Sequence, residues 1–233
     1  MLYALFADLH GNWPATQALE KDLARRGVDH IYCLGDIVGK GPSSDRTFDW
    51  AMANCDLILG GNWDYGVGYK QYAPDHYYWE QLGEKRLEAL RNLPTEKTLT
   101  LSGRRIRLFH GRPIMRELVL AQDDVSAIEP FFTDCNGFRC DVVGYADAHR
   151  QALRTITPGI FFNTGSVGNA LGVTACCYAL LEGEPKDAGA ALEVRLVTVP
   201  YDRDAVLNDA SQATQVPRID TFIREVQTGR YSR

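Results

Sequence analysis

Short apolar runs alternate with polar, glycine-containing segments along most of this 233-residue chain. The first run, LYALFA at 2–7, has the length of a buried strand. In the following NWPATQALEKDLARRG, Asn12 can cap a helix, Pro14 suits its first turn and Gly27 can end it. HIYCLG and DLILGG are typical of two more strands, with the helical SDRTFDWAMANC between them. This β-α-β-α-β order predicts parallel strands joined by right-handed crossovers.

The second half of the chain contains further strand patterns. YYWEQLGEKRLEALRNL is helical, and KTLTLSGRRIRLFHG alternates on both sides of Ser102-Gly103, as a hairpin does. The remaining strand candidates are DVVGYA, IFFNTG, CCYALLEG and ALEVRLVTV. Two short helices are expected around 203–211 and 217–228. A parallel half followed by a hairpin-rich half predicts two packed sheets with helices outside.

The composition indicates a folded protein rather than a disordered one, with 45% hydrophobic and 24% charged residues. The length suits a single domain over 1–233. A net charge of −5 argues against a general duplex-binding protein, and no apolar run approaches the roughly 20 residues of a membrane span. The N-terminal apolar stretch carries no basic leader or cleavage signal, so we expect a cytoplasmic protein. The six cysteines form no CxxC pair and are expected to be reduced structural residues.

Residues that can bind a metal follow five of the predicted strands. They occur in Asp8-Leu9-His10, Gly35-Asp36, Gly60-Gly61-Asn62, His110 and Asp147-Ala148-His149. Singly, each has an ordinary explanation as a helix cap, a turn or a hydrogen-bonded histidine. Together they predict one site, because sites in open α/β sheets form beyond the carboxyl ends of strands. Burying several carboxylates there would be costly unless a cation neutralised them.

The candidate ligands are carboxylate, amide and imidazole groups without a thiolate. This set suits Mn²⁺, Fe²⁺, Zn²⁺ or Mg²⁺ and disfavours a structural zinc–thiolate site. The candidates are too many for one ion, so the pattern favours a pair of ions bridged by a carboxylate. Such pairs lie roughly 3.5–4 Å apart and clamp phosphoryl oxygens.

Five short motifs carry a resemblance to a known family. DLH, GDIVGKGP, GNWD, FHG and ADAH occur in the order found in the calcineurin-like metallophosphoesterases, which this chain resembles. The likeness is strongest to their small bacterial and archaeal branch, and NTGSVGN and VPYD also fit, so it covers nearly the whole chain. It implies a four-layer α/β/β/α sandwich, with two mixed central sheets and a dinuclear metal site at the carboxyl ends of the strands.

The resemblance also implies a role for each motif residue. Asp8, His10, Asp36 and His149 would hold the first metal, with Asp36 as the bridge, and Asn62, His110 and Asp147 would hold the second. Asp64 is expected to brace the loop that carries Asn62, and Asp36, Asn62, Asp64 and His110 are the expected catalytic set. Mn²⁺ is the expected ion, with Fe, Zn, Mg or Ni as alternatives.

Two positions depart from the family pattern. The usual final motif is Gly-His-Thr-His, whereas this chain has Ala146-Asp147-Ala148-His149, so Asp147 stands in place of the first histidine. A carboxylate can still bind a metal; alternatively Asp147 points away and the second metal is weak or absent. Trp63 stands where many relatives have a proton-donating histidine, and an indole N–H can only donate a hydrogen bond.

Three further features have a functional and an ordinary interpretation. Lys40, Arg112 and Arg150 lie beside the motifs and would bind phosphate, or they are solvated surface residues. NTGSVGN at 163–169 would offer amides to a phosphate, or it is a tight turn. The rings in DHYYWE at 75–80, which are His76, Tyr77, Tyr78 and Trp79, would stack on a nucleobase, or they pack along a helix face. Trp63 is a further candidate for substrate binding.

These observations favour a metal-dependent phosphodiesterase that acts on nucleotide-type or activated diesters, with a hydroxide between the metals as the attacking group. The alternatives are a phosphomonoesterase, including a phosphoprotein phosphatase, and a catalytically degenerate scaffold that binds a nucleotide or a partner. We expect a small phosphorylated substrate and neither duplex nucleic acid nor a membrane. The oligomeric state stays open.

Overall fold

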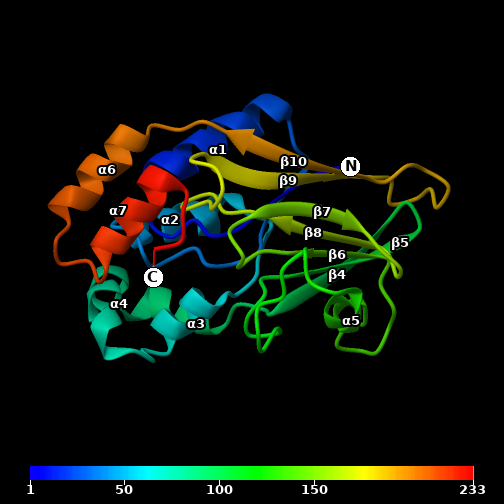
Figure 1. Cartoon of the computed structure of the whole chain (residues 1–233), viewed down its shortest axis with the longest axis horizontal. Coiled ribbons are helices and arrows are strands. Elements are labelled where there is room, and N and C mark those ends of the chain that lie inside the picture. Colours follow the sequence, from blue (N-terminus) through cyan, green and yellow to red (C-terminus); the bar gives the residue numbers. More distant parts are fainter. Residues whose placement is uncertain (233) are drawn as a thin grey trace.

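Two five-stranded sheets pack face to face at the centre of the computed structural model, which describes residues 1–232 (Figure 1). The first sheet has the order β10-β9-β1-β2-β3 and the second the order β4-β5-β6-β8-β7. Strands of the first sheet are β1 (Leu2–Phe6), β2 (His30–Cys33), β3 (Leu57–Ile58), β9 (Cys176–Glu182) and β10 (Glu193–Val199). Strands of the second are β4 (Glu96–Leu101), β5 (Arg104–Phe109), β6 (Val142–Tyr145), β7 (Gln151–Thr155) and β8 (Ile160–Thr164).

Helices connect and cover these sheets. They are α1 (Trp13–Arg26), α2 (Ser44–Asn54), α3 (Asn62–Gly68), α4 (His76–Arg91), α5 (Val125–Ile128), α6 (Arg203–Gln212) and α7 (Ile219–Thr228), with 3₁₀ helices η1 (Ala73–Asp75) and η2 (Glu129–Phe132). As predicted, the Asn12 side chain caps α1 by accepting from the Ala15 amide at 3.1 Å, and Gly27 ends it in the left-handed conformation. Within residues 1–232, none of these helices combines the length and the apolarity that a bilayer crossing requires.

The first sheet is mixed. Strands β1, β2 and β3 are parallel, which confirms the predicted β-α-β-α-β start. However, β9 and β10 come from the other end of the chain and pair antiparallel beside β1. The hairpin-rich second half is also confirmed, by the antiparallel pairs β4–β5, β7–β8 and β9–β10, although β5, β6 and β8 are parallel in the second sheet. The nearly continuous apolar run of β9 suits its position between β10 and β1, because both its faces are buried.

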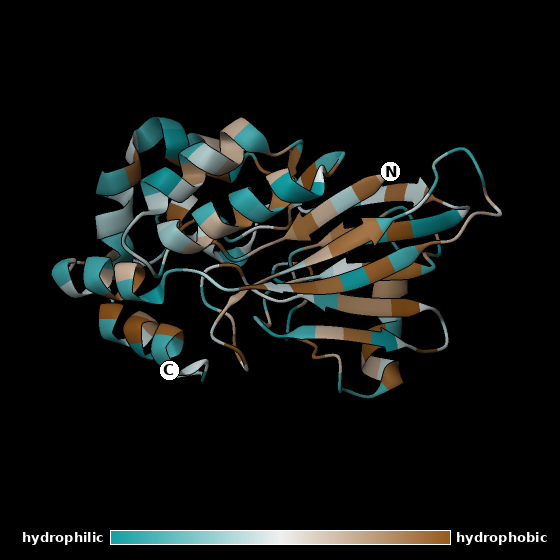
Figure 2. Cartoon of the chain, turned by 90° about the horizontal axis from the view of Figure 1, so that it is seen from above, coloured by the Kyte–Doolittle hydropathy of each residue, from teal (hydrophilic) through white to brown (hydrophobic). Residues whose placement is uncertain are grey.

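Alternating side chains of β1 define the layers. Ala4 and Phe6 face the core beneath the helices α1, α2, α4, α6 and α7, whereas Tyr3 and Leu5 face the second sheet. The outer face of the second sheet is covered by the short helices α5 and η2 through the third core cluster. The order is thus helices, sheet, sheet and a thin helical layer. Figure 2 shows hydrophobic residues concentrated along the strands and hydrophilic ones over much of the helical surface.

One helix next to the strand ends was not predicted from the sequence. The expected strand DLILGG forms β3 only at Leu57–Ile58, and α3 begins at Asn62. Gly66 and Gly68 have low helix propensity and conceal this helix in the sequence. Tertiary packing compensates, because a Cβ on Gly68 would lie 3.1 Å from Leu90 Cβ in α4. The hairpin at Ser102-Gly103 and the last two helices agree with the prediction.

Candidate metal centre

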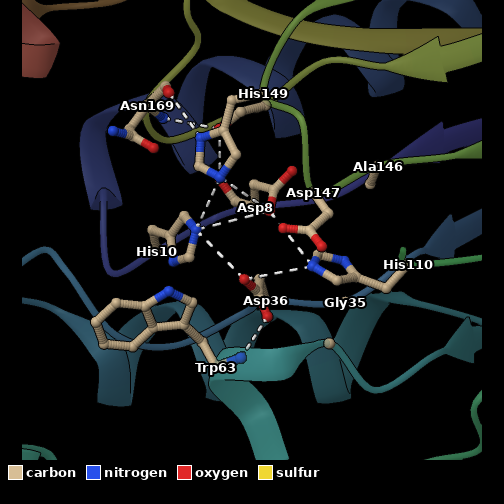
Figure 3. Close-up of polar contacts among 12 residues, drawn as sticks. Asp8, His10, Gly35, Asp36, Trp63, His110, Ala146, Asp147, His149 and Asn169 are labelled. Carbon is tan, nitrogen blue, oxygen red and sulfur yellow. Dashed lines mark hydrogen bonds and ion pairs between the residues drawn. The ribbon is translucent and has the colours of Figure 1, made fainter. Parts of the chain in front are cut away.

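The predicted metal-binding residues gather at one edge of the two sheets, where β1, β2, β5 and β6 end (Figure 3). Asp8 and His10 follow β1, Asp36 follows β2, His110 follows β5, and Asp147 and His149 follow β6. All six side chains are buried, and Asn62, the first residue of α3, is partly buried. Segments far apart in sequence therefore form one cluster, as the positions after the strands predicted.

Two overlapping groups of side chains within the cluster are close enough to share an ion. The first consists of Asp8, His10 and His149, and the second of Asp8, Asp36 and His110. Asp8 Oδ1 lies 3.3 Å from His149 Nε2 and 3.6 Å from His10 Nε2. Asp36 Oδ2 lies 3.4 Å from His110 Nε2 and 3.6 Å from His10 Nε2. Both carboxylates thus lie between the two groups.

The three histidines are oriented as ligands usually are. Each has its Nδ1 next to a backbone carbonyl oxygen: Val38 for His10 at 3.1 Å, Leu34 for His110 at 2.8 Å and Asn169 for His149 at 2.9 Å. A carbonyl can only accept, so Nδ1 carries the proton and Nε2 faces the cluster. His10 Nε2 and His149 Nε2 lie 3.3 Å apart, so a cation between or beside them would relieve the repulsion between their lone pairs.

Several buried polar atoms fit a divalent ion. Both oxygens of Asp8 and Oδ1 of Asn62 accept no hydrogen bond from the described residues, and Nε2 of His110 has no hydrogen-bond partner among them. Burial alone would lower the pKa of His110, but Asp36 and Asp8 outweigh it and raise this pKa to about 10. Unpaired buried acceptors are costly, and an ion coordinated by oxygen and imidazole would satisfy them. The residues present therefore fit the metal that the resemblance implies.

The backbone at the strand ends adopts an unusual conformation. Positive φ angles occur at Asp8 (58°), His10 (45°), Asp36 (54°), Asp147 (64°) and His149 (57°). Few residues other than glycine adopt this left-handed region, which costs energy and occurs often at functional sites. Here the reversal after each strand directs the side chain into the cluster.

Asp64 supports the cluster through backbone hydrogen bonds and belongs to neither group of candidate ligands. Its carboxylate accepts from the backbone amides of Asp36 at 2.7 Å, Ile37 at 2.9 Å and Gly61 at 3.0 Å. Burial and the neighbouring charge of Asp36 raise the pKa of Asp64 to about 7. The side chain thereby connects the loop after β2 with the start of α3. This geometry agrees with the bracing role expected from the sequence.

Asp147 differs from the other predicted ligands, because it belongs to neither group. Its oxygens accept from Arg112 Nη2 at 2.5 Å, from Nε at 2.7 Å and from the Arg112 amide at 3.0 Å. Burial opposes ionisation of this carboxyl, but Arg112 outweighs it and lowers the pKa of Asp147 to about 2. Asp147 is therefore a charged carboxylate already paired with an arginine.

Trp63 packs over the cluster. Its ring lies edge-on to His10, with centroids 5.8 Å apart, and to Tyr78 at 6.2 Å. A Cβ on Gly39 would lie 2.2 Å from the Trp63 ring, so the loop at Gly39 provides the space for the indole. The Trp63 amide donates to Asp36 Oδ1 at 2.8 Å. Tyr78 is fully buried, which favours helix packing over base stacking for this member of DHYYWE.

A pocket of about 480 Å³ opens onto the cluster. Lys40, Arg112 and Arg150, the three cations noted in the sequence, line it together with Asp36, Asp147 and His149. Lys40 Nζ lies 3.2 Å from His149 Nε2 and 3.1 Å from Asn169 Oδ1. The three basic side chains therefore line the same pocket as the candidate metal ligands.

Glu225 of α7 also lines this pocket and was not identified from the sequence. It is buried and accepts from Asn169 Nδ2 at 2.5 Å. The residue lies in an amphipathic helix with no motif around it, so its sequence carries no signal for a role at the site. Only the packing of α7 over the loop at Asn169 reveals it.

The NTGSVGN segment forms a tight turn whose amides are already bonded. Gly168 donates to Asp8 O at 2.8 Å, Val167 to Ala7 O at 3.0 Å and Asn169 to Ser166 Oγ at 2.9 Å. A Cβ on Gly168 would lie 2.0 Å from Leu9 O, so this approach requires glycine. The turn supports the loop of Asp8, and these three amides are not left for a phosphate.

Comparisons with known proteins agree with this arrangement. The model of the calcineurin-like phosphoesterase superfamily domain matches residues 1–186. A metallophosphoesterase structure from Sphaerobacter thermophilus is 20% identical, with a TM-score of 0.75 over 98% of this chain and 99% of that chain. A hypothetical protein from Pyrococcus horikoshii is 23% identical, with a TM-score of 0.76 over 99% of each chain. At these identities the two structures support the fold.

A sequence relative is known from Methanocaldococcus jannaschii. This uncharacterized protein is 30% identical over 122 residues, which are 48% of this chain and 50% of that protein. The match thus spans about half of the relative. Residues after 186, including α6 and α7, lie beyond the family match, although Glu225 from this part reaches the pocket.

Proposed function

The chain belongs to the calcineurin-like phosphoesterase superfamily, and from this premise we propose that it is a metal-dependent phosphodiesterase for nucleotide-type or other activated diesters. The observation that carries this proposal is the meeting of two pockets at the metal centre. A phosphodiester has two substituents on phosphorus, so its enzyme needs room for a group beyond the phosphoryl oxygens.

The residues that would hold the ions follow from the two groups. Asp8, His10 and His149 would hold the first ion, and Asp36 lies close enough to join them. Asp36, Asn62 and His110 would hold the second. When bound, such ions polarise phosphoryl oxygens and lower the pKa of a coordinated water. Manganese is the ion we propose, since oxygen and imidazole ligands without thiolate suit it.

The basic side chains of the first pocket would hold the phosphoryl group. Lys40 lies beside His149, Arg112 is paired with Asp147, and Arg150 follows the ligand His149. Charge-assisted hydrogen bonds from such groups stabilise the charge that develops on phosphoryl oxygens in the transition state. Trp63, which packs over His10, would shield part of the phosphoryl group from water.

A second pocket of about 430 Å³ begins at the same place. It shares Trp63 and Arg112 with the first pocket and extends between α3, η1 and the start of α7. Its lining adds the aromatic rings of Tyr65 and Tyr72 and the polar groups of Gln71, Asp75 and Arg218. Aromatic faces combined with hydrogen-bonding groups suit a nucleobase. We propose that this pocket takes the nucleoside substituent that stays on phosphorus, while the other substituent leaves.

Trp63 limits the chemistry of that leaving group. An indole cannot supply a proton at neutral pH, so the departing oxygen receives no help from this position. Leaving groups that are stable anions need none. Activated aryl diesters and phosphoanhydrides meet this condition, whereas simple alkyl monoesters do not.

The test is hydrolysis of bis(p-nitrophenyl) phosphate and p-nitrophenyl phosphate by Mn²⁺-loaded protein. A higher kcat/KM for the diester supports the proposal, and a higher value for the monoester identifies a phosphomonoesterase instead. Turnover of neither compound with any divalent metal would favour a nucleotide- or partner-binding scaffold. The scaffold remains the second candidate because Asp147 is occupied by Arg112 and Trp63 replaces a histidine.

The second pocket is tested with a nucleoside p-nitrophenyl phosphodiester. Tyr72→Ala should raise its KM several-fold and leave the KM for bis(p-nitrophenyl) phosphate nearly unchanged. Tyr69→Ala is the matched control, because Tyr69 is similarly exposed, at 57% against 60% for Tyr72, but does not line the pocket. Equal effects of both variants would contradict the nucleoside assignment.

A further inference from the structure

The pair of Asp147 and Arg112 is the most completely bonded ion pair at the site. Three donors of one residue, the amide, Nε and Nη2 of Arg112, reach the two oxygens of Asp147. The Asp147 side chain is only 2% exposed, whereas that of Arg112 is 46% exposed. A planar guanidinium in this two-pronged geometry binds a carboxylate strongly and fixes its orientation.

The local backbone is built for this contact. Gly111 has φ 154°, and a Cβ placed on it would lie 2.7 Å from Asp147 Cβ. Only a residue without a side chain lets the segment of Arg112 approach Asp147 so closely. The approach also brings the Arg112 amide within hydrogen-bonding distance of Oδ2. The ion pair therefore depends on backbone as well as side-chain geometry.

Binding of a metal by Asp147 would conflict with this pair. A carboxylate has about four lone-pair positions, and three of those of Asp147 already accept from Arg112. A divalent ion at the remaining position would lie beside a guanidinium, and the two positive charges would repel each other. The second group of Asp8, Asp36 and His110 does not depend on Asp147, and Asn62 Oδ1 offers a further ligand atom.

The pair also preserves the charge of the site. The family pattern places a neutral histidine where Asp147 stands, and Asp147 together with Arg112 is neutral as well. Arg112 lines both pockets at the metal centre. A guanidinium has about five N–H donors, and Asp147 accepts from two of them, so the others are available to a phosphate. Asp147 thus holds the Arg112 guanidinium on the side of the centre where the second metal ion would lie.

We propose that Asp147 is the positioning residue of Arg112 rather than a metal ligand, and that Arg112 supplies the positive charge on the second side of the centre. The protein then binds one divalent ion tightly, at Asp8, His10, His149 and Asp36, and a second only weakly. The part concerning phosphate rests on the proposed function, whereas the part concerning metal binding does not.

The experiment counts metal ions without any substrate. Native protein and variants are loaded with Mn²⁺, passed through a desalting column, and their metal-to-protein ratio is measured by mass spectrometry, with Mn²⁺ affinities from calorimetry. We expect one tightly bound ion in native protein and in Asp147→Ala, with affinities within about threefold. Asp147→Asn, which keeps the shape of the side chain, should behave in the same way if Asp147→Ala folds poorly.

A second variant places a histidine at position 147, where the family pattern has a metal ligand. Asp147→His should bind a second ion at least tenfold more tightly than native protein does, because an imidazole can ligate without attracting Arg112. Two tightly bound ions in native protein, one of them lost in Asp147→Ala or Asp147→Asn, would overturn the proposal. Arg116→Ala, on the same loop but exposed and outside both pockets, is the control and should keep the native metal content.

Positioning of Arg112 is read from phosphate binding. In Mn²⁺-loaded protein, Asp147→Ala and Arg112→Ala should each weaken the binding of inorganic phosphate about tenfold or more without loss of the tight ion. Unchanged phosphate affinity in both variants would refute the role of Arg112. Metal stoichiometry requires no turnover, so it stands even if the protein hydrolyses no diester; the diester assay in turn tests the proposed function whatever the ion count.

Discussion

The two sides of the metal centre satisfy their carboxylates in different ways. On the first side, both oxygens of Asp8 accept no hydrogen bond from the described residues, and His10 Nε2 faces His149 Nε2 at 3.3 Å. On the second side, Asp147 is bound by three donors of Arg112. On the first side the Asp8 carboxylate is thus left for an ion from solution, although Lys40 lies beside His149, whereas on the second side Arg112 already neutralises Asp147. Similar motifs can thus encode two different sources of positive charge.

Asp36 belongs to both sides, and its replacement should have the largest effect. Its Oδ2 lies between His10 and His110, so Asp36→Asn removes a negative charge from each ion position. Ion stabilisation of the transition state is worth several kcal/mol, so kcat should fall on the order of 10³-fold. Metal content should fall in parallel. Full activity in Asp36→Asn would remove the basis for a shared carboxylate.

His149→Ala and Asp147→Ala should differ in their effect on metal binding, because they change different sides of the metal centre. It deletes a ligand of the first group, and the loss in metal affinity should exceed the roughly 10–100-fold typical of outer partners. Asp147→Ala should leave the same tight ion in place. Calorimetric titration with Mn²⁺ measures both. If the two variants lost the same ion to the same extent, the contrast between the sides would be wrong.

Trp63→His tests which leaving groups the centre accepts, because it adds a proton donor where both pockets meet. General acid catalysis is worth about 10²–10⁴-fold, so hydrolysis of an alkyl diester should rise on the order of 10²-fold. Hydrolysis of bis(p-nitrophenyl) phosphate should change little. The measurement is the dependence of kcat on leaving-group pKa, steep in native protein and shallower in Trp63→His. A flat native dependence, with chemistry rate-limiting, would reveal another acid.

Asp64→Asn should give the smallest of these effects. Its carboxylate accepts from three backbone amides, and an amide side chain has one acceptor oxygen in place of two. Metal affinity should fall roughly 10–100-fold on both sides, because the loop of Asp36 loses its support. Stability should fall by about 1–3 kcal/mol, as measured by urea unfolding. A loss confined to one ion would show that Asp64 supports one side only.

The site residues that follow the strands could be predicted from the sequence, because they depend on local patterns. Hydrophobic runs indicated where β1, β2 and β5 stop, and the carboxyl ends of parallel strands meet at one edge, so the buried cluster of Asp8, Asp36 and His110 could be predicted. The hairpin at Ser102-Gly103 was equally local. Sheet partnership was not, because the pairing of β9 with β1 depends on residues more than 170 positions apart.

The Arg112–Asp147 pair lay outside the reach of sequence reasoning for the same reason. The two residues are 35 positions apart, and each has an ordinary role when considered alone. What brings them together is the missing side chain of Gly111, whose effect is visible only in three dimensions. The helix α3 was missed because its glycines resemble a turn, although packing against α4 stabilises it.

The left-handed backbone at the strand ends has a consequence for how this protein evolves. Glycine at Asp8, His10, Asp36, Asp147 or His149 would relax a conformation that costs on the order of 1 kcal/mol per residue. At Asp8 it would also remove a buried carboxylate whose oxygens accept no hydrogen bond from the described residues, so this substitution is expected to make the fold more heat-resistant while destroying the site. Selection for thermal stability alone would therefore favour an inert protein at this position. Asp8 thus marks a position that only selection for activity can maintain.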